Sequence, residues 1–414
     1  MGVVVQKYGG TSVGDAARIR NVAARVAKRH AQGDAIAVVV SAMGHTTDEL
    51  IAIAAQISPR PDPREMDVLL STGELISCSL LAMALHELGV PALSMGATLA
   101  GIRTDEAFGR ASITQIDATR VRAALEAGQV VVVAGFQGFT PDGQITTLGR
   151  GGSDTTAVAL AAALEAERCE VYTDVDGIYT ADPRLVPTAR KMVELGYEEM
   201  LELASYGAKM HPRSIELGAW YRVPILVASS MHEVPGTLIH DIDDEAAARQ
   251  TGGGMEISNK VRGVTYQRGV ARITVRAVPD QPGVAARLFE PLTEAGISVD
   301  TIVQNASAEH LTDVSFTVNQ TDAPRALEIS QGIASAIGAA DCTADEHLGS
   351  VSIVGTGMQN APGYASRMFR ALSEAKVNIE MITTSQIRIT CIVGADQVAD
   401  AVRALHATFD LDED

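Results

Sequence analysis

Through about the first 240 residues, short apolar runs alternate with segments of helical pattern, and no other feature limits the possible folds as strongly. The apolar runs, which we expect to be strands, lie at residues 3–6, 35–40, 90–95, 130–139, 169–174 and 223–229. Strands that alternate with helices in this way form a largely parallel sheet with helices on both faces. The pattern therefore predicts an α/β domain over residues 1–240.

The composition changes after residue 240, where an acidic stretch is followed by three consecutive glycines. We interpret residues 241–262 as a linker between domains. The formal charge of the whole chain is −18, which argues against binding to nucleic acid or anionic membrane surfaces, but not against a nucleotide. Four cysteines are scattered without a Cys-x-x-Cys pair, so we expect small buried side chains in a reducing compartment and no metal site.

Beyond the linker the chain repeats itself with a period of 80 residues. The segment Gln281–Val284 matches Ala361–Tyr364, and the positions that follow match at the same spacing. Each copy reads strand, Pro-Gly turn, helix, strand, so we expect two small modules, at residues 263–342 and 343–414, packed side by side. A Pro-Gly turn that opens a helix exposes N–H groups that can bind a carboxylate. A duplicated module without a ligand remains the alternative.

A glycine-rich run from Gly149 to Thr156 lies between a strand-like segment and an alanine-rich helical segment. Its glycines let backbone N–H groups approach an anion, and the helix that Ser153 and Asp154 open favours negative charge at its N-terminus. Arg150 adds a forked cation that suits a carboxylate or a phosphate. We predict an anion site here; a glycine turn that binds nothing is the alternative.

A second glycine turn, from Lys7 to Ser12, follows the first predicted strand and precedes an amphipathic helix. The turn has neither the order of a P-loop nor the G-x-G-x-x-G spacing of the dinucleotide-binding fingerprint. Gly9 and Gly10 leave backbone donors open, and Lys7 supplies a mobile positive charge, which together suit a phosphate. A surface lysine at a tight turn is the alternative interpretation.

Four motifs in this order resemble those of the aspartate kinases, of the monofunctional actinobacterial type. They are Lys7–Ser12, Ser41–Leu50, Gly149–Ala157 and Thr173–Gly177. The resemblance covers the whole chain and implies an amino acid kinase fold, α/β with a largely parallel central sheet, followed by two ferredoxin-like α+β ACT modules. It also implies phosphoryl transfer from ATP, with Mg²⁺, to the β-carboxylate of L-aspartate. Because that carboxylate is already a nucleophile, the protein has to bring two anions together and neutralise charge.

The resemblance also implies roles for individual residues. It makes Lys7 the contact to the γ-phosphate, and Asp154 the second catalytic residue, which holds Lys7 or another cation in place. The nucleotide would be bound by Lys7, Gly9, Gly10, Thr173, Asp174, Tyr179, Arg184 and Lys209. The aspartate would be bound by Ser41, Thr47, Glu74, Arg150 and Ser153, with Glu74 at the ammonium and Arg150 at the α-carboxylate. Without the resemblance, Glu74 would be taken for a solvated helix residue and Asp154 for a helix N-cap.

Regulation is expected at the two Pro-Gly turns and at the starts of the facing strands. The expected effector positions are Asp280, Gly283, Val284, Ala285, Ser298, Val299, Asp300, Gln304, Asn305, Met358, Ala361, Tyr364, Asn378, Ile379, Glu380 and Thr384. The resemblance implies inhibition by lysine and threonine together and a homo-oligomer formed through the ACT modules. Some relatives also make a separate regulatory subunit, which would start here at Met255. Relatives usually carry Ser-His-Pro-Gly-Val where this chain has Asn360-Ala-Pro-Gly-Tyr364, so we expect retained but altered feedback.

Two other functions stay open at this point. One is another kinase of the same superfamily, such as a glutamate or acetylglutamate kinase, and the other is a catalytically inactive amino-acid sensor. The doubled repeat and the Ser41–Leu50 motif argue against the first function. The second is opposed by four intact residues: Lys7, Arg150, Asp154 and Lys209. With no signal peptide or membrane-spanning run in view, we expect a cytoplasmic enzyme that binds small molecules and copies of itself, not nucleic acid or a membrane.

Overall fold

The structure is a computed structural model that describes residues 2–205, 210–242, 261–305, 310–358 and 362–413. The chain divides into two compact units. The first comprises residues 1–179 and 191–256, and the second comprises residues 180–190 and 257–414. Most of the expected linker at 241–262 lies outside the described residues. The internal segment 180–190 belongs to the C-terminal unit.

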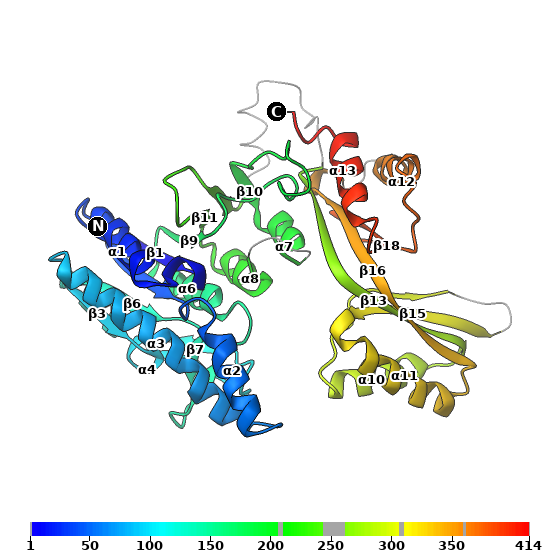
Figure 1. Cartoon of the computed structure of the whole chain (residues 1–414), viewed down its shortest axis with the longest axis horizontal. Helices are drawn as coiled ribbons and strands as arrows, with labels where there is room; N and C mark the ends of the chain where they lie inside the picture. The colour runs from blue at the N-terminus through cyan, green and yellow to red at the C-terminus, as the bar shows by residue number, and fades with distance from the viewer. Residues whose placement is uncertain (1, 206–209, 243–260, 306–309, 359–361, 414) are drawn as a thin grey trace. The chain divides into compact units, whose positions relative to one another are not determined.

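An eight-stranded sheet forms the centre of the first unit (Figure 1). Its strands are β1 (Val3–Tyr8), β2 (Ala35–Val40), β3 (Ala92–Met95), β6 (Val130–Ala134), β9 (Arg168–Thr173), β10 (Glu194–Gly196), β11 (Ile225–Ser229) and β12 (Thr237–His240). Their order is β10-β12-β11-β9-β1-β2-β6-β3, and every neighbouring pair is parallel except β11 and β12. The predicted parallel sheet is confirmed, and β1 lies near its middle.

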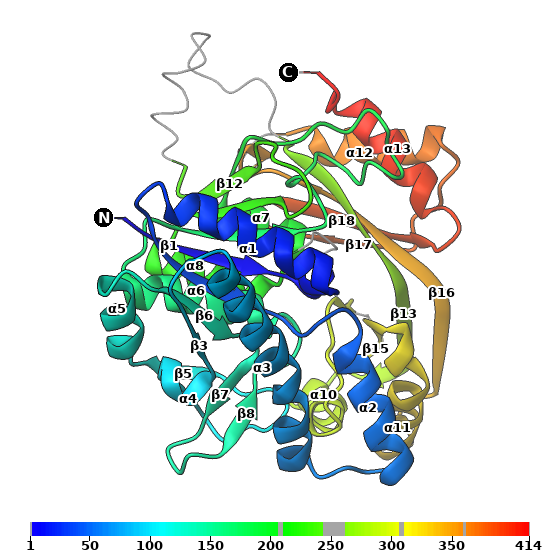
Figure 2. The same ribbon diagram turned by 60° about the vertical axis from the view of Figure 1, so that its left-hand side comes forward.

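Helices cover both faces of this sheet, as predicted. On one face, α1 (Ala16–His30) and α3 (Pro63–Glu87) share a buried core with β1, β2 and β6, and Figure 2 shows these two helices together. On the other face, α5 (Thr119–Glu126) packs on β2 and β6, and α6 (Gly152–Leu164) packs on β1 and β9. The apolar positions expected to face the core from the first helix are all buried: Ile19, Val22, Ala23 and Val26.

A second, four-stranded sheet in the same unit has the order β5-β4-β7-β8. Its strands are β4 (Ile102–Thr104), β5 (Ile113–Ile116), β7 (Gln137–Phe139) and β8 (Ile145–Thr147). The run 130–139, expected as one strand, is divided between the two sheets because the chain turns at Phe136, where φ is +67°. The unit is completed by α2 (Thr46–Ile57), α4 (Ala97–Ala100), α7 (Tyr197–Ser205), α8 (Pro212–Tyr221) and the 3₁₀ helix η1 (Gly10–Val13).

Among the described residues, α3 is the one helix long and apolar enough to cross a membrane. That result rests on length and composition alone, and core helices of globular proteins pass the same test. One face of α3 is buried in the core of the first unit and carries two acidic side chains, Asp67 and Glu74. The rest of the helix also carries apolar side chains that are exposed: Leu75, Ile76, Leu80 and Met83.

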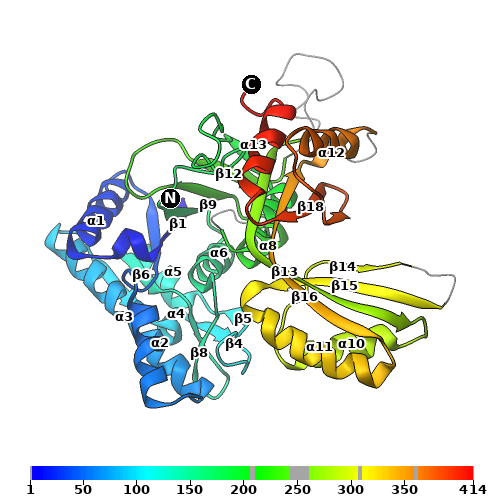
Figure 3. The same ribbon diagram turned by 45° about the vertical axis from the view of Figure 1, so that its right-hand side comes forward.

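A six-stranded sheet in the order β14-β15-β13-β16-β18-β17 forms the second unit (Figure 3). The first repeat supplies β13 (Gly263–Pro279), β14 (Ile302–Gln304) and β15 (Leu311–Asn319). The second supplies β16 (Asp341–Val354), β17 (Met381–Thr384) and β18 (Arg388–Gly394). Because the long strands β13 and β16 pair antiparallel, the two repeats lie side by side in one continuous sheet, as predicted.

Each repeat contributes two helices to this unit. The first has α10 (Val284–Glu294) and α11 (Ala323–Ile337), with the 3₁₀ helix η2 (Gln320–Asp322), and Figure 3 shows α10 and α11 side by side. The second has α12 (Tyr364–Glu374) and α13 (Val398–Thr408), with the 3₁₀ helix η3 (Thr356–Met358). Gly283 and Gly363 are the N-caps of α10 and α12, with φ of +88° and +110°, so the Pro-Gly turn is used in the same way twice.

Residues 180–190 belong to the second unit although they interrupt the first. Ala181 and Val186 are buried in the core that α12 and α13 cover. The carbonyl of Thr180 accepts the N–H of Val264 (2.7 Å), and its hydroxyl is hydrogen-bonded to Nε2 of His406 on α13 (3.0 Å). The core of the second repeat is thus completed by a segment from the N-terminal part of the chain.

Candidate active site

The ends of β1 and β2 meet at one edge of the central sheet, and their loops are bound together. The N–H of Ser41 donates to the carbonyl of Tyr8 (3.1 Å). A Cβ at Gly10 would lie 2.9 Å from the carbonyl oxygen of Ala42, so the approach of the two loops requires a glycine here. The N–H of Gly9 donates to a β9 carbonyl at 3.3 Å, which fixes the turn to the neighbouring strand on the other side.

Lys7 points to the face of the sheet that α6 covers. Its Nζ lies 2.6 Å from Oδ1 of Asp154, and the two side chains are only 11% and 12% exposed. The short distance makes this an ion pair, although its angle is not that of a hydrogen bond. Because an unpaired charge is costly in such surroundings, the pairing offsets part of the cost of burying the two groups. This is the contact expected for Asp154; its part in catalysis stays a prediction.

The helix α6 begins at Gly152, after an N-cap at Gly151 with a φ of +68°. Asp154 is therefore not the N-cap, and the helix begins one residue before Ser153, where the sequence was expected to open it. The carboxylate instead lies in the first turn, where the helix dipole favours it. A Cβ at Gly151 would lie 2.2 Å from the side chain of His211, so glycine is required. Burial lowers the pKa of His211, and the nearby Asp154 charge opposes that shift.

Arg150 and Ser153 lie on either side of this helix start. Arg150 is exposed, and it has no hydrogen-bond or ion-pair partner among the described residues. Ser153 is buried, and its Oγ would lie 2.8 Å from a Cβ at Gly135, which leaves room only for glycine there. The guanidinium is therefore open to an anionic ligand, whereas the serine is part of the packed wall.

Glu74 is 3% exposed on α3, so it is not the solvated helix residue that the sequence alone suggests. Its Oε1 accepts the N–H of Ala42 (3.0 Å), whereas Oε2 is buried without a hydrogen-bond partner. The neighbouring Gly73 allows this approach, because a Cβ there would lie 2.8 Å from the Ala42 Cβ. Burial raises the pKa of Glu74 to about 7. A buried carboxylate with one oxygen that has no hydrogen-bond partner suits a cationic group of a ligand.

The remaining expected aspartate contacts lie in the loop that follows β2. Ser41 is half-buried, and its carbonyl accepts the hydroxyl of Ser77 on α3 (2.7 Å). Thr47 is half-buried in the first turn of α2. The structure thus joins the ends of β1 and β2 to the middle of α3, and it joins Lys7 to the first turn of α6.

The expected nucleotide residues after β9 are divided between the two units. Thr173 ends β9, and its hydroxyl donates to the carboxylate of Asp174 (3.1 Å). Tyr179 is the last residue of the first unit before the excursion into the second. Arg184 belongs to the second unit, where its guanidinium makes a two-point contact with the carboxylate of Asp182 (2.6 and 3.0 Å). A nucleotide-binding role for Arg184 stays a prediction.

The expected effector positions all belong to the second unit. Among them, Glu380 accepts hydrogen bonds from Arg272 on β13 (3.3 Å) and from Asn378 (2.8 Å). This carboxylate therefore links the two repeats across the shared sheet. Ala361 and the expected phosphate cation Lys209 lie outside the described residues.

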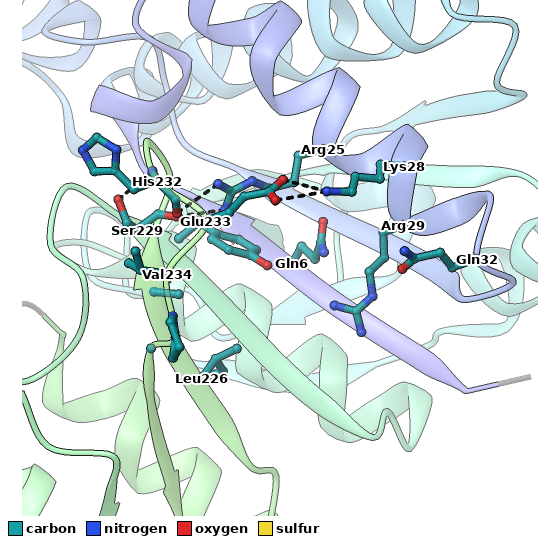
Figure 4. Close-up of a pocket in the computed structure, with 14 residues that line it drawn as sticks. Gln6, Arg25, Lys28, Arg29, Gln32, Leu226, Ser229, His232, Glu233 and Val234 are labelled. Atoms are coloured by element: carbon teal, nitrogen blue, oxygen red, sulfur yellow. Dashed lines mark hydrogen bonds and ion pairs between the residues drawn. The ribbon is translucent and has the colours of Figure 1, made fainter.

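A cavity of about 340 Å³ opens on the other face of β1 from Lys7, next to Gln6 (Figure 4). Its cations come from α1, and each is already paired: Arg25 with two backbone carbonyls, Lys28 with Glu233, and Arg29 with Asp34 and Glu170. Because these charges are satisfied within the protein, the cavity offers no free cation to a ligand. The sheet separates it from the Lys7–Asp154 ion pair, which lies on the face that α6 covers.

Sequence reasoning missed two charged residues that hold the loops around Arg150. Asp67 on α3 is 0% exposed and accepts hydrogen bonds from Gly109 and Thr147, while Arg213 on α8 donates to two backbone carbonyls. A signal for Asp67 was present, because it lies seven residues before Glu74 and so shares a face of an apolar helix. Arg213 carried no comparable signal.

Comparisons with known proteins agree with this architecture. The model of the amino acid kinase family matches residues 2–229, and the ACT domain model matches residues 273–330 and 351–409. An aspartokinase from Pseudomonas aeruginosa is 49% identical over 413 residues, which span 100% of this chain and 98% of the relative. The crystal structure of E. coli aspartokinase III with aspartate and ADP, in the R-state, is 27% identical with a TM-score of 0.80, over 98% of this chain and 99% of that one. The T-state structure of the same protein with lysine and aspartate matches over the same shares, at 27% identity and a TM-score of 0.75.

Proposed function

This chain belongs to the aspartokinases, within the amino acid kinase family, and uses ATP to phosphorylate the β-carboxylate of L-aspartate under ACT-domain regulation; we propose that the residues at the ends of β1 and β2, in mid-α3 and at the start of α6 carry this reaction. The observation that supports the proposal most is the buried ion pair between Lys7 and Asp154. It holds a cation beside the glycine turn where transferred phosphate would lie.

In this proposal Lys7 neutralises the γ-phosphate while it is transferred, and the N–H groups of Gly9 and Gly10 add dipoles. Asp154 is 2.6 Å from the ammonium and keeps it in place before the nucleotide arrives. A preorganised cation of this kind stabilises the charge of a phosphoryl-transfer transition state without reorganisation during the reaction. The attacking carboxylate needs no general base, so positioning and charge neutralisation are the whole task of the site.

The proposed aspartate pocket rests on two groups of opposite charge: Oε2 of Glu74, which has no hydrogen-bond partner, and the guanidinium of Arg150, which has none among the described residues. The buried Oε2 of Glu74 would accept a hydrogen bond from the substrate ammonium. The exposed guanidinium of Arg150 would bind the α-carboxylate in a two-point contact. Ser41, Thr47 and Ser153 would complete the pocket. The β-carboxylate would then face Lys7 and the γ-phosphate.

The nucleotide would be bound by Thr173, Asp174 and Tyr179 after β9, with Arg184 and Lys209 as further phosphate contacts. Mg²⁺ would arrive with ATP and neutralise phosphate charge. Among the described residues no three His, Cys, Asp or Glu side chains form a metal cage. In this proposal phosphate oxygens and water hold most of the Mg²⁺ coordination.

For regulation we propose lysine and threonine as effectors, bound at the Pro-Gly turns that start α10 and α12. We further propose a cytoplasmic homo-oligomer that assembles through the ACT modules. The T-state structure of the E. coli relative is a complex with lysine and aspartate, which supports lysine as an effector for the class; threonine rests on the sequence resemblance. A separate regulatory subunit starting at Met255 is part of the same proposal.

A coupled assay of ADP release tests the substrate assignment directly. Release with aspartate, but not with glutamate or without an acceptor, is the expected result. Release with glutamate or N-acetylglutamate alone would identify another kinase of the superfamily. No release with any acceptor, from a folded protein that binds ATP or lysine, would identify an inactive sensor.

A further inference from the structure

The loop that presents Arg150 contains three glycines, two of which have positive φ: Gly149 at +74° and Gly151 at +68°. Such a loop gains nothing from side-chain packing of its own, so its position must be fixed from outside. The side chain of Arg150 has no partner among the described residues. The position of its guanidinium therefore depends on the position of the loop backbone. Two charged side chains from distant elements bind the chain next to this loop.

The first is Asp67 of α3, which is 0% exposed. Its Oδ2 accepts the N–H of Thr147 (2.8 Å), and its Oδ1 accepts the hydroxyl of the same residue (2.6 Å). Both carboxylate oxygens also accept the N–H of Gly109, at 3.0 and 2.9 Å. One buried carboxylate therefore joins the 109–111 loop to the end of β8, two residues before the glycines begin.

The second is Arg213 of α8, which binds the same two loops. Its Nη1 donates to the carbonyl of Leu148 (2.9 Å), and its Nη2 donates to the carbonyl of Ala111 (3.0 Å). The N–H of Ala111 in turn donates to the carbonyl of Thr147 (2.9 Å). Two charged side chains thus connect the 109–111 and 147–148 segments. The Asp67 carboxylate binds their N–H groups, and the Arg213 guanidinium binds their carbonyls.

We propose that Asp67 and Arg213 are positioning residues for aspartate: they hold the 147–151 loop so that Arg150 meets the α-carboxylate of the substrate. This inference rests on the proposed function, in which Arg150 binds that carboxylate. Neither residue touches substrate, and both act through Arg150. A misplacement of about 1 Å in such a supporting contact is enough to lose up to roughly a hundredfold in rate.

A purely structural role would give a different result. Loss of a buried, fully bonded carboxylate destabilises any protein, and the fraction of folded enzyme falls whatever the residue positions. Such a loss lowers the apparent kcat and leaves both KM values unchanged. A positioning role raises the KM for aspartate and spares the KM for ATP. The split between the two KM values therefore separates the roles.

The test compares Asp67→Asn with Glu170→Gln in the full-length chain. Glu170 is a matched control, because its carboxylate is also 0% exposed and accepts hydrogen bonds from Gln6, Arg29 and Tyr172, none of which belongs to the loops around Arg150. Both variants should show a lowered Tm. Only Asp67→Asn should raise the KM for aspartate, by about tenfold or more, with the KM for ATP within about twofold. Equal KM values for aspartate in the two variants would overturn the inference.

A second comparison asks whether Asp67 acts through Arg150. If it does, Asp67→Asn should raise the KM for aspartate much less in an Arg150→Ala background than in the natural chain, because the guanidinium it positions is already gone. Full additivity would overturn the inference. If Arg150→Ala alone leaves the KM for aspartate unchanged, the proposed pocket fails, and that result is distinct from failure of the positioning role.

Milder variants keep the test decisive should Asp67→Asn not fold. Thr147→Val removes one of the hydrogen bonds to Asp67 and leaves the backbone bond in place, so a smaller rise in the same KM is expected. Arg213→Lys keeps the charge but cannot reach both carbonyls with one fork, and it should shift the KM for aspartate in the same direction. No change in either variant would overturn the inference.

Discussion

The ammonium of Lys7 lies 2.6 Å from the carboxylate of Asp154, and this contact joins the end of β1 to the first turn of α6. The two residues are far apart in the sequence, and each lies next to a glycine-rich turn. One ion pair therefore brings the two glycine-rich turns of the chain together. The expected consequences for catalysis, pH dependence, substrate binding and regulation can be measured separately.

Lys7→Ala should remove most turnover while the protein stays folded. Loss of one preorganised cation at a phosphoryl-transfer site costs on the order of a hundredfold in kcat. Lys28→Ala is the matched control, because Lys28 is an exposed lysine paired with Glu233 on the far face of the sheet. Steady-state kinetics on both variants, with circular dichroism as a check of folding, decide the point. Near-normal turnover in Lys7→Ala would refute the assignment.

The KM for aspartate should fall as the pH rises through about 7. Burial raises the pKa of Glu74 to about 7, above its ordinary value, so the side chain becomes an anion only near neutral pH. The charged form binds the substrate ammonium. Stability changes in the opposite direction. The folded state of the free enzyme holds the Glu74 proton more tightly than the unfolded state, so the free energy of unfolding decreases as the pH rises from the ordinary glutamate pKa to about 7.

The control for this prediction is Glu74→Gln, which should show a high KM for aspartate that no longer changes between about pH 6 and pH 8. Initial-rate measurements over that range, with ATP saturating, give both profiles. A natural enzyme whose KM for aspartate is flat over the range would show that Glu74 does not meet the ammonium.

Arg150→Ala should raise the KM for aspartate by at least about tenfold and leave the KM for ATP nearly unchanged. Truncating one partner of a desolvated charge pair costs roughly 2 kcal/mol or more. Arg110→Ala is a suitable comparison, because Arg110 is an exposed arginine in the adjoining 109–111 loop. A rise confined to the KM for ATP would place Arg150 on the nucleotide and not on the amino acid.

Feedback should be present but weaker than in relatives that carry histidine and valine at the second Pro-Gly turn. Lysine with threonine should inhibit moderately, and threonine alone should have almost no effect. Coupling free energies between sites are modest, roughly 1–3 kcal/mol, so one altered site changes the response. Activity over a grid of lysine and threonine concentrations measures this.

The matched variant for feedback carries Ala361→His and Tyr364→Val together. Stronger inhibition by the pair of effectors is expected in this variant. If the natural chain is already inhibited strongly at low effector concentrations, and the double substitution changes nothing, the turn does not set the response.

Much of the fold could be predicted from sequence because its signals are local. The apolar run 35–40 is β2 with the same bounds, and the 80-residue period returned two repeats whose helices begin at Val284 and Tyr364. The prediction of one strand over 130–139 is wrong because the apolar pattern continues through the bend at Phe136; Gly135, directly before it, was the sequence signal for a break.

The site was less accessible to sequence reasoning, because its properties depend on burial. The raised pKa of Glu74 depends on how closely α3 approaches Ala42, which a helical pattern does not show. In the sequence Asp67 is an ordinary acidic residue. In the structure its carboxylate accepts hydrogen bonds from Gly109 and Thr147, with four donor–acceptor distances of 3.0 Å or less. The motifs located the turns, and only the packing of the helices shows which charges those turns hold in place.

The segment 180–190 belongs to the second unit, although the residues before and after it in the chain belong to the first. Its backbone supplies the carbonyl for the N–H of Val264, and Ala181 and Val186 fill part of the core beneath α12 and α13. A polypeptide that begins at residue 255 contains both repeats and lacks this segment. In such a fragment the N–H of Val264 would lose this acceptor, and the core beneath α12 and α13 would lose two buried apolar side chains.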